Sequence, residues 1–389
     1  MAKKKKMVRG LVLSGGGARA AYQAGVIKAI ADIQLEAGIT EPPFQVYTGE
    51  SAGAINVSLL ASHADNFQVG AKELWDCWAG LKMEDIIATN PVSLLSNAGR
   101  WMADLGMGGI LPAEKSPSFL LDNTPLKQYL APRIKFGRIR ELLHDNQLQG
   151  LGISVTNYAT GSAVTFYDSA HGVKPWARSH RLGMEAQLSL DHVLASTAIP
   201  ILFPAVKIGQ SFYGDGSVRM KAPLSPCIHL GANSLLAIGL RYYRTAQQTV
   251  EINESWKMNS LSLADVAGVL LNAGFLDNLD SDLERLERIN HTLHLIPPHL
   301  HQELPNELQP IHALAMRPSE DLGSLAAESI DSFGRVLKFL LKGLGIARNS
   351  SWDLVSYLAF DKAYTAKLLD LGYADGIAQK KAILTFLSA

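Results

Sequence analysis

The chain lacks an excess of charge of either sign: its 389 residues include 36 Lys plus Arg and 36 Asp plus Glu. A protein that binds nucleic acid electrostatically needs a basic excess, so the composition excludes that class. Hydrophobic residues make up 47% of the chain, which excludes an intrinsically disordered protein. At this length we expect two or three units, or one large α/β domain with a helical extension.

Cysteine is scarce, and long apolar runs are missing. Cys77 and Cys227 have no CxxC spacing, which disfavours a zinc site and suits a reducing compartment. No run reaches the ~18 apolar residues of a membrane-spanning helix. Too few apolar residues follow the basic start for a signal peptide. We therefore expect a cytoplasmic protein in which residues 1–7 form a disordered basic tail, with contact to anionic lipid as the alternative.

The first 61 residues alternate between strand and helix patterns. Apolar runs at Val8–Ser14 and Phe44–Thr48 predict buried strands, and each is followed at once by a helical pattern, Ala18–Ala37 and Ser51–Ala61. This alternation predicts a mostly parallel sheet covered on both faces.

Later segments predict further elements of such a fold. We expect a hairpin from Leu151–Asn157 and Ala163–Tyr167 and a core strand at Leu235–Leu240. Beyond Arg241 the pattern is mainly helical, with one candidate late strand at Leu293–Ile296, before two prolines.

Two other segments have candidate roles at a surface. Asn90–Ser118 is rich in Gly, Pro, Ser and Asn and is either a lid or lipid-facing segment or a plain surface loop. Phe333–Leu344 has the pattern of a basic amphipathic helix, which either docks on its own domain or lies in a membrane interface.

The most informative local motif is the GxSxG pentapeptide from Gly49 to Gly53, between a predicted strand and a predicted helix. A sharp turn there projects the Ser51 hydroxyl, and glycines on both sides remove side chains that would collide with it. The helix N-terminus favours negative charge near Ser51. The motif predicts a nucleophile, with a simple helix N-cap at Ser51 as the alternative.

A second glycine-rich loop, Gly15–Gly17 followed by Arg19, also joins a strand to a helix. Its N–H groups can converge to bind an anion. A dinucleotide loop fits poorly because no acidic residue ends a second strand about 20 residues later. An oxyanion hole, in which Arg19 supports the loop or the oxyanion, and a plain tight turn remain open.

A serine nucleophile needs a base. The chain has eleven histidines, but none has a distinctive local context. Asp215 lies in an Asp-Gly turn that can present its carboxylate into a cleft, so it is a candidate base, although such a turn is often only a turn.

These motifs, taken in order, resemble the patatin-like phospholipases: GGGARAAY, GESAGA, Ala195–Pro200 with Phe203-Pro204, and the Asp-Gly turn. The resemblance implies a Ser-Asp dyad without a histidine, with Ser51 as nucleophile and Asp215 as base. It also implies that Gly15, Gly16, Gly17 and Arg19 form the oxyanion loop, and that Gly49 and Gly53 flank the nucleophile. Two residues depart from the usual pattern of the family. Ala20 stands where many members have glycine, and Ser217 stands where glycine or alanine is more common.

The resemblance implies a three-layer α/β/α fold in which residues 8–300 form the patatin-like domain and residues 301–389 a helical segment packed on it. It implies a lipid acyl hydrolase that needs no metal or other cofactor and acts on phospholipids or other acyl lipids, with peripheral membrane contact. Three alternatives remain: an acyltransferase with the same dyad, a histidine-dependent α/β-hydrolase, and a non-catalytic lipid-binding regulator.

Overall fold

The computed structural model describes residues 7–89, 119–255, 263–297, 299–300, 308–335, 338 and 352–388. The lid candidate Asn90–Ser118 lies outside these residues. Most of the predicted tail, residues 1–6, and most of the amphipathic segment Phe333–Leu344 also lie outside them.

The centre of the described structure is one ten-stranded sheet. Its first five strands run in the order β10-β9-β1-β2-β3, and all four neighbouring pairs are parallel. These strands are β1 (Arg9–Leu13), β2 (Val46–Glu50), β3 (Gly150–Asn157), β9 (Ser234–Ile238) and β10 (His312–Met316). The remaining strands are β4 (Ala163–Ser169), β5 (Trp176–Arg178), β6 (Arg181–Glu185), β7 (Val206–Ile208) and β8 (Ser211–Asp215).

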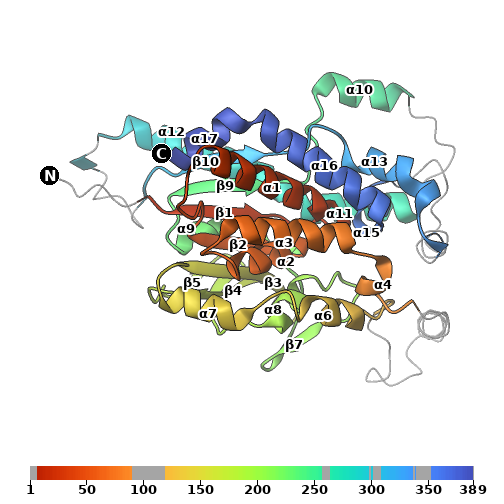
Figure 1. The fold of residues 1–389 in the computed structure, drawn as a ribbon, viewed down its shortest axis with the longest axis horizontal. Coiled ribbons are helices and arrows are strands. Elements are labelled where there is room, and N and C mark those ends of the chain that lie inside the picture. Colours follow the sequence, from red (N-terminus) through yellow and green to blue (C-terminus); the bar gives the residue numbers. More distant parts are fainter. Residues whose placement is uncertain are drawn as a thin grey trace.

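Helices cover both faces of this sheet. On β1, Leu11 and Leu13 belong to the apolar cluster of one face, whereas Val12 belongs to the cluster of the other. The first face packs against α1 (Ala21–Glu36), α2 (Ala52–Ala61), α3 (Phe67–Gly80) and α16 (Lys362–Ala378). The second packs against α9 (Ser225–His229) and α12 (Asp277–Leu295). The expected α/β fold with a mostly parallel sheet between helical layers is therefore confirmed (Figure 1).

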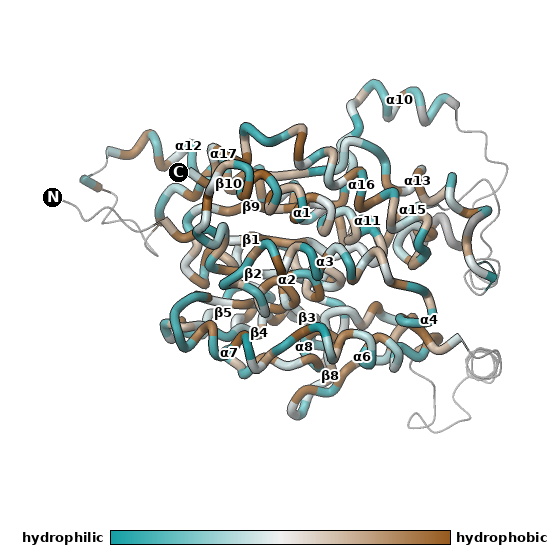
Figure 2. Tube along the Cα trace, in the orientation of Figure 1, coloured by the Kyte–Doolittle hydropathy of each residue, from teal (hydrophilic) through white to brown (hydrophobic). Residues whose placement is uncertain are grey.

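The other helices lie around these layers. They are α4 (Met83–Ile86), α6 (Thr124–Leu130), α7 (Phe136–His144), α8 (Leu190–Ser196), α10 (Ala246–Ser255), α11 (Leu263–Phe275), α13 (Leu322–Ser329), α15 (Trp352–Leu358) and α17 (Lys380–Ser388). In Figure 2 the central strands carry mostly hydrophobic residues in brown, while the outer helix α10 is largely teal. Among the described residues, no helix is both long enough and apolar enough to cross a bilayer.

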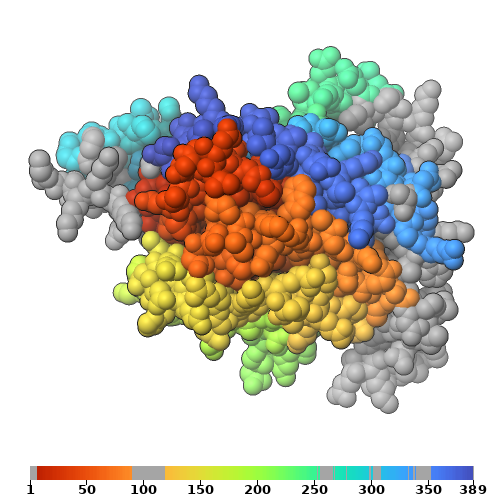
Figure 3. Space-filling model, in the orientation of Figure 1, coloured from red at the N-terminus to blue at the C-terminus, as the bar shows by residue number. Residues whose placement is uncertain are grey.

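The two ends of the sequence pack closely together through α1 and α16. A Cβ added at Gly25 would lie 2.2 Å from the carbonyl oxygen of Leu369, and one added at Gly372 would lie 2.1 Å from that of Tyr22. The Tyr22 hydroxyl donates a 2.9 Å hydrogen bond to the buried Asp375 carboxylate. In Figure 3 the red N-terminal and blue C-terminal segments accordingly lie side by side on one face of the molecule.

The predicted late strand Leu293–Ile296 is wrong. Helix α12 runs to Leu295 and buries Leu279, Leu283, Leu286 and Leu293, whose spacings of four, three and seven residues place them along one side of a helix. The last strand is instead β10, which forms one end of the sheet. The sheet thus takes a strand from residues 301–389, for which we expected helices.

Candidate active site

Ser51 lies at a sharp turn between β2 and α2, with φ 51° and ψ −129°. This conformation is strained for a residue other than glycine, and such strain is typical of functional turns. A Cβ at Gly49 would lie 2.5 Å from the Gly53 carbonyl oxygen, and one at Gly53 would lie 2.2 Å from that of Leu13. Only glycine fits at these two positions, so the turn has the shape that the GxSxG motif predicts.

The hydrogen-bond partner of Ser51 lies at the end of β8. Strands β2 and β8 both pair with β3. Glu50, the last residue of β2, pairs with Ser154, and Asp215, the last residue of β8, pairs with the adjacent Val155. The two strands thus end next to each other, which brings Ser51 and Asp215 together. The Ser51 hydroxyl donates a 2.6 Å hydrogen bond to Oδ2 of Asp215.

The Asp215 carboxyl is fully buried and firmly held. Its Oδ1 accepts a 2.9 Å hydrogen bond from the Ser217 N–H, while its main chain bonds to Ala198 and to the Thr156 hydroxyl. Burial raises the pKa of Asp215 to about 7, and hydrogen bonds from Ser51 and Ser217 oppose the rise. A carboxyl with this pKa can accept and return a proton near neutral pH.

A second carboxyl, that of Glu50, is buried next to the first. Burial raises its pKa well above the ordinary range, the neighbouring Asp215 raises it further, and a hydrogen bond from the Gly15 N–H lowers it. Because its pKa is raised, the Glu50 carboxyl resists ionisation, which disfavours a second negative charge beside Asp215.

Ser196 links the turn at Ser51 to β3 through two hydrogen bonds. Its hydroxyl accepts a 2.8 Å hydrogen bond from the Ser51 N–H and donates one of 2.6 Å to the Ser154 carbonyl oxygen. Ser196 is fully buried at the end of α8. The sequence analysis placed this residue in a family motif but gave it no role; no local signal identified its partner 145 residues away.

The glycine loop lies directly against Ser51. A Cβ at Gly15 would lie 2.7 Å from the Ser51 Cβ and 2.2 Å from the Ser217 hydroxyl oxygen. Gly17 has φ 58°, which favours glycine, and it lines the same pocket as Ser51. The structure therefore brings the backbone of the predicted oxyanion loop beside the candidate nucleophile.

The Arg19 side chain makes its polar contacts with helix α15. Its Nε donates a 2.7 Å hydrogen bond to the Ser356 hydroxyl, and its Nη2 pairs with Asp353 at 2.8 Å. The guanidinium carbon also lies 4.5 Å from the centre of the Tyr357 ring. These contacts, all with α15, favour support of the loop over direct contact with an oxyanion.

Two of the more buried histidines, His192 and His229, contact groups other than Ser51 and Asp215. The His192 ring accepts a hydrogen bond from the Ser189 N–H, and the His229 ring stacks on Trp176. Burial lowers the pKa of His192 and, with two nearby arginines, that of His229 to about 4. In the described part of the chain no hydrogen bond joins a histidine to Ser51 or Asp215, and no group of three or more His, Cys, Asp or Glu is placed to hold a metal.

A narrow apolar pocket opens beside Ser51. Its walls come from α2, α3, α6 and the segment after α8, and include Ile55, Trp78, Leu130 and Phe203. Its volume is about 40 Å³, far below the roughly 300–1,000 Å³ of a site for a drug-sized ligand. The pocket suits an apolar group of small cross-section next to the hydroxyl.

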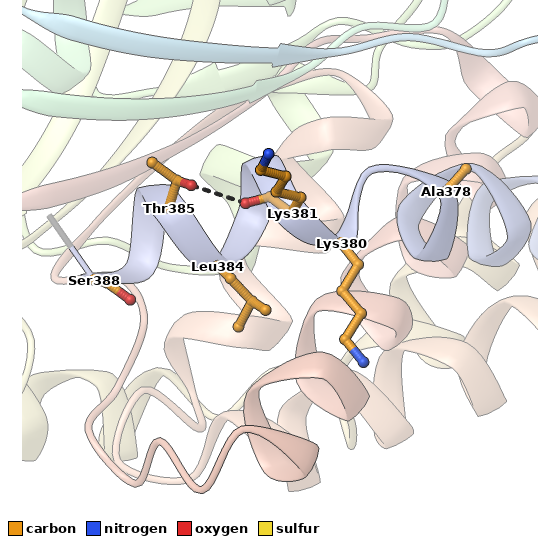
Figure 4. Close-up of a pocket in the computed structure, with 6 residues that line it drawn as sticks. All are labelled: Ala378, Lys380, Lys381, Leu384, Thr385 and Ser388. Atoms are coloured by element: carbon orange, nitrogen blue, oxygen red, sulfur yellow. Dashed lines mark hydrogen bonds between the residues drawn. The ribbon is translucent and has the colours of Figure 1, made fainter.

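A wider hollow of about 900 Å³ lies on α17 (Figure 4), lined by Ala378, Lys380, Lys381, Leu384, Thr385 and Ser388. Arg9, at the start of β1, donates a hydrogen bond to Leu387 of α17, whereas Ser51 follows the end of the parallel strand β2. This hollow therefore lies at the end of the sheet where β1 and β2 begin, opposite the end at which Ser51 lies. Its lining residues include no Asp, Glu, His or Cys.

Comparisons with known proteins show which family the chain belongs to. The model of the family "Patatin-like phospholipase" matches residues 11–228, more than half of the chain. No curated protein matches. Solved structures that match the chain include VipD from Legionella pneumophila, with 13% identity, a TM-score of 0.35, and coverage of 97% of this chain and 67% of that one.

Two further structures share low identity with the chain. Human GIVD cytosolic phospholipase A2 in complex with methyl gamma-linolenyl fluorophosphonate shows 14% identity and a TM-score of 0.42, covering 98% of this chain and 58% of that one. ExoU of Pseudomonas aeruginosa, in complex with SpcU, shows 16% identity and a TM-score of 0.27, covering 96% and 77%. The family match spans every predicted site residue from Gly15 to Asp215, and on it the chain belongs to the patatin-like phospholipase family.

Proposed function

We propose that the protein is a lipid acyl hydrolase that cleaves carboxylic esters with a Ser51–Asp215 dyad. Membership of the patatin-like phospholipase family supports a lipid hydrolase. The observation that carries the finer proposal is the 2.6 Å hydrogen bond from the Ser51 hydroxyl to Asp215, beside an apolar pocket and a glycine loop.

In the first step Asp215 takes the hydroxyl proton as Ser51 Oγ forms a bond to the ester carbonyl carbon. The ester C–O bond then breaks, and the leaving alcohol or lysolipid takes the proton from Asp215. In the second step Asp215 removes a proton from water, whose oxygen attacks the acyl-enzyme. The bond to Oγ breaks, the proton returns to Ser51, and the fatty acid leaves.

The N–H groups of the Gly15–Gly17 loop are proposed to stabilise the oxyanion of both steps. Preorganised backbone donors at such a position contribute strongly to catalysis. The Gly15 N–H also bonds to Glu50, so Gly16 and Gly17 are the better candidates for direct contact. Gly49 and Gly53 shape the turn, and Arg19 supports the loop.

The first carbons of the substrate's acyl chain, next to the ester carbonyl, are proposed to enter the narrow apolar pocket beside Ser51. Its lining residues offer contacts to methylene groups and few polar groups. This placement supports an acyl lipid, such as a phospholipid, as the substrate. Contact with a membrane surface would bring such a lipid to the pocket.

The test compares wild type with Ser51→Ala and Asp215→Asn. It measures fatty-acid release from phospholipid vesicles and hydrolysis of a short-chain chromogenic ester. Ser51→Ala should lower kcat by about 10⁶-fold, as loss of a serine nucleophile does. Asp215→Asn should lower kcat by about 10³-fold, within the range for loss of a general base. Matched controls are Ser62→Ala and Asp375→Asn, which change buried, hydrogen-bonded residues outside the site.

Other outcomes would replace the proposal with a specific alternative. Activity that survives Asp215→Asn but is lost on substitution of one histidine would indicate a histidine-dependent hydrolase. Transfer of the acyl group to an added lipid alcohol in preference to water would indicate an acyltransferase. Lipid binding by a wild-type protein with no turnover would indicate a non-catalytic regulator.

A further inference from the structure

The oxyanion loop is held by a helix far away in the sequence. Arg19, two residues after the last loop glycine, is 3% exposed, and both of its side-chain partners, Asp353 and Ser356, lie in α15. The partners are 334 and 337 residues later in the chain. They also lie outside residues 11–228, which match the family model.

The main chain of α15 contacts the loop as well. A Cβ at Gly17 would lie 2.3 Å from the Tyr357 carbonyl oxygen, so this glycine packs directly on the backbone of α15. Phe360, just after the helix, lines the pocket that contains Ser51 and Gly17. The glycine loop therefore lies between the nucleophile turn on one side and α15 on the other.

Helix α15 is itself fixed by α11, which lies beside it in Figure 1. The Tyr357 hydroxyl donates a 3.1 Å hydrogen bond to Asn272, and its ring packs edge-on against Phe275 at 5.7 Å. A Cβ at Gly268 would lie 3.2 Å from that of Asp353, so the two helices are in close contact. A firmly held helix can fix the position of the side chain that binds to it.

We propose that Asp353 and Ser356 are positioning residues of the active site, which hold Arg19 and thereby the glycine loop that faces Ser51. A buried guanidinium needs partners for its charge and its donors, and these two residues supply them. Without them Arg19 would move towards water, and the loop next to it would lose its fixed geometry. The inference rests on the proposed function, because it assigns these residues to the reaction at Ser51.

The experiment measures kcat and KM on a short-chain chromogenic ester, together with Tm, for Asp353→Asn and Ser356→Ala. The control for the first variant is Asp280→Asn, because Asp280 also pairs with an arginine, Arg317. The control for the second is Ser62→Ala, which removes another buried hydroxyl with two hydrogen bonds. Both controls lie outside the site and should keep the wild-type kcat.

We expect Asp353→Asn to lower kcat about tenfold with little change in KM. Removal of a whole oxyanion donor lowers kcat by about 10²- to 10³-fold, and a donor that is only less well positioned should cost less. Ser356→Ala should lower kcat in the same way, so the inference stays testable if the first variant does not fold. In an Arg19→Lys background Asp353→Asn should add little further loss, because both changes act through one contact.

Equal kcat in the two variants and their controls, whatever the change in Tm, would show that α15 only stabilises the fold and would overturn the inference. In that case the proposed function would stand, because wild type would still turn over the ester. A wild-type protein without turnover, whose ester hydrolysis equals that of Ser51→Ala, would instead refute the proposed function and this inference with it.

Discussion

Because the Asp215 carboxyl is buried, we expect its ionisation to lower the free energy of unfolding at neutral pH. The carboxyl is fully buried, and its pKa rises from 3.8 to about 7 on folding. The folded state therefore binds this proton more tightly than the unfolded state does. Between these two pKa values the unfolded state has lost the proton and the folded state keeps it, so folding must take up a proton. The free energy of unfolding therefore falls as pH rises.

The size of the effect follows from the shift. One pKa unit corresponds to 1.36 kcal/mol, so a rise of about three units costs about 4 kcal/mol once the pH exceeds 7. Asp215→Asn keeps the shape of the side chain without the charge. The variant should therefore gain stability relative to wild type as pH rises, by about 3 kcal/mol between pH 5 and pH 8.

Urea denaturation of both proteins at pH 5 and at pH 8 measures this gain. Other titrating groups are present in both proteins, so they largely cancel in the difference between the two free energies of unfolding. Asp215→Asn should at the same time be inactive, which would show stability given up for function. A difference that is the same at both pH values would refute the argument that burial raises the pKa of this carboxyl.

Four other predictions concern activity on chromogenic esters. Ser196→Ala should lower kcat about tenfold because the Ser51 N–H loses its acceptor, whereas the control Ser62→Ala should keep the wild-type kcat. Equal kcat values in the two variants would show that Ser196 does not fix the turn. Gly17→Ala should abolish turnover because its Cβ would collide with the Tyr357 carbonyl oxygen, and full activity would mean that the loop tolerates the shift. Trp78→Ala should move the preferred ester to longer chains by widening the pocket; an unchanged preference would place the acyl chain elsewhere. Wild-type kcat/KM should fall about tenfold per pH unit below pH 7, and a flat profile down to pH 5 would contradict a carboxylate base with a pKa of about 7.

Local geometry could be predicted from local sequence. The turn at Ser51 depends on glycines two positions away on either side, so five consecutive residues were enough to predict it. The alternation of strands and helices over the first 61 residues likewise gave the parallel order of β1 and β2. The strand expected at Leu293–Ile296 was wrong because three apolar residues within four positions before a proline fit a strand, while the wider helical spacing over α12 determines the structure.

Long-range pairs could not be predicted from patterns alone. The Ser51–Asp215 contact spans 164 residues and depends on β8 ending against β3 where β2 ends. The Asp-Gly turn made Asp215 one candidate base, and the family resemblance paired it with Ser51. Ser196 and Asp353 act through hydrogen bonds to distant partners, and a serine or an aspartate in a helix has no sequence feature that identifies such a partner.

The contact between Arg19 and α15 also orders events during synthesis of the chain. At roughly 5–20 residues per second, Asp353 is made about 17 to 70 seconds after Arg19. Ser51 and Asp215 are both present well before that time, yet the glycine loop of the nascent chain still lacks the helix that holds it. On the proposed function, a ribosome-bound chain would carry Ser51 and Asp215 without a fixed glycine loop, and ester hydrolysis would stay slow until α15 docks.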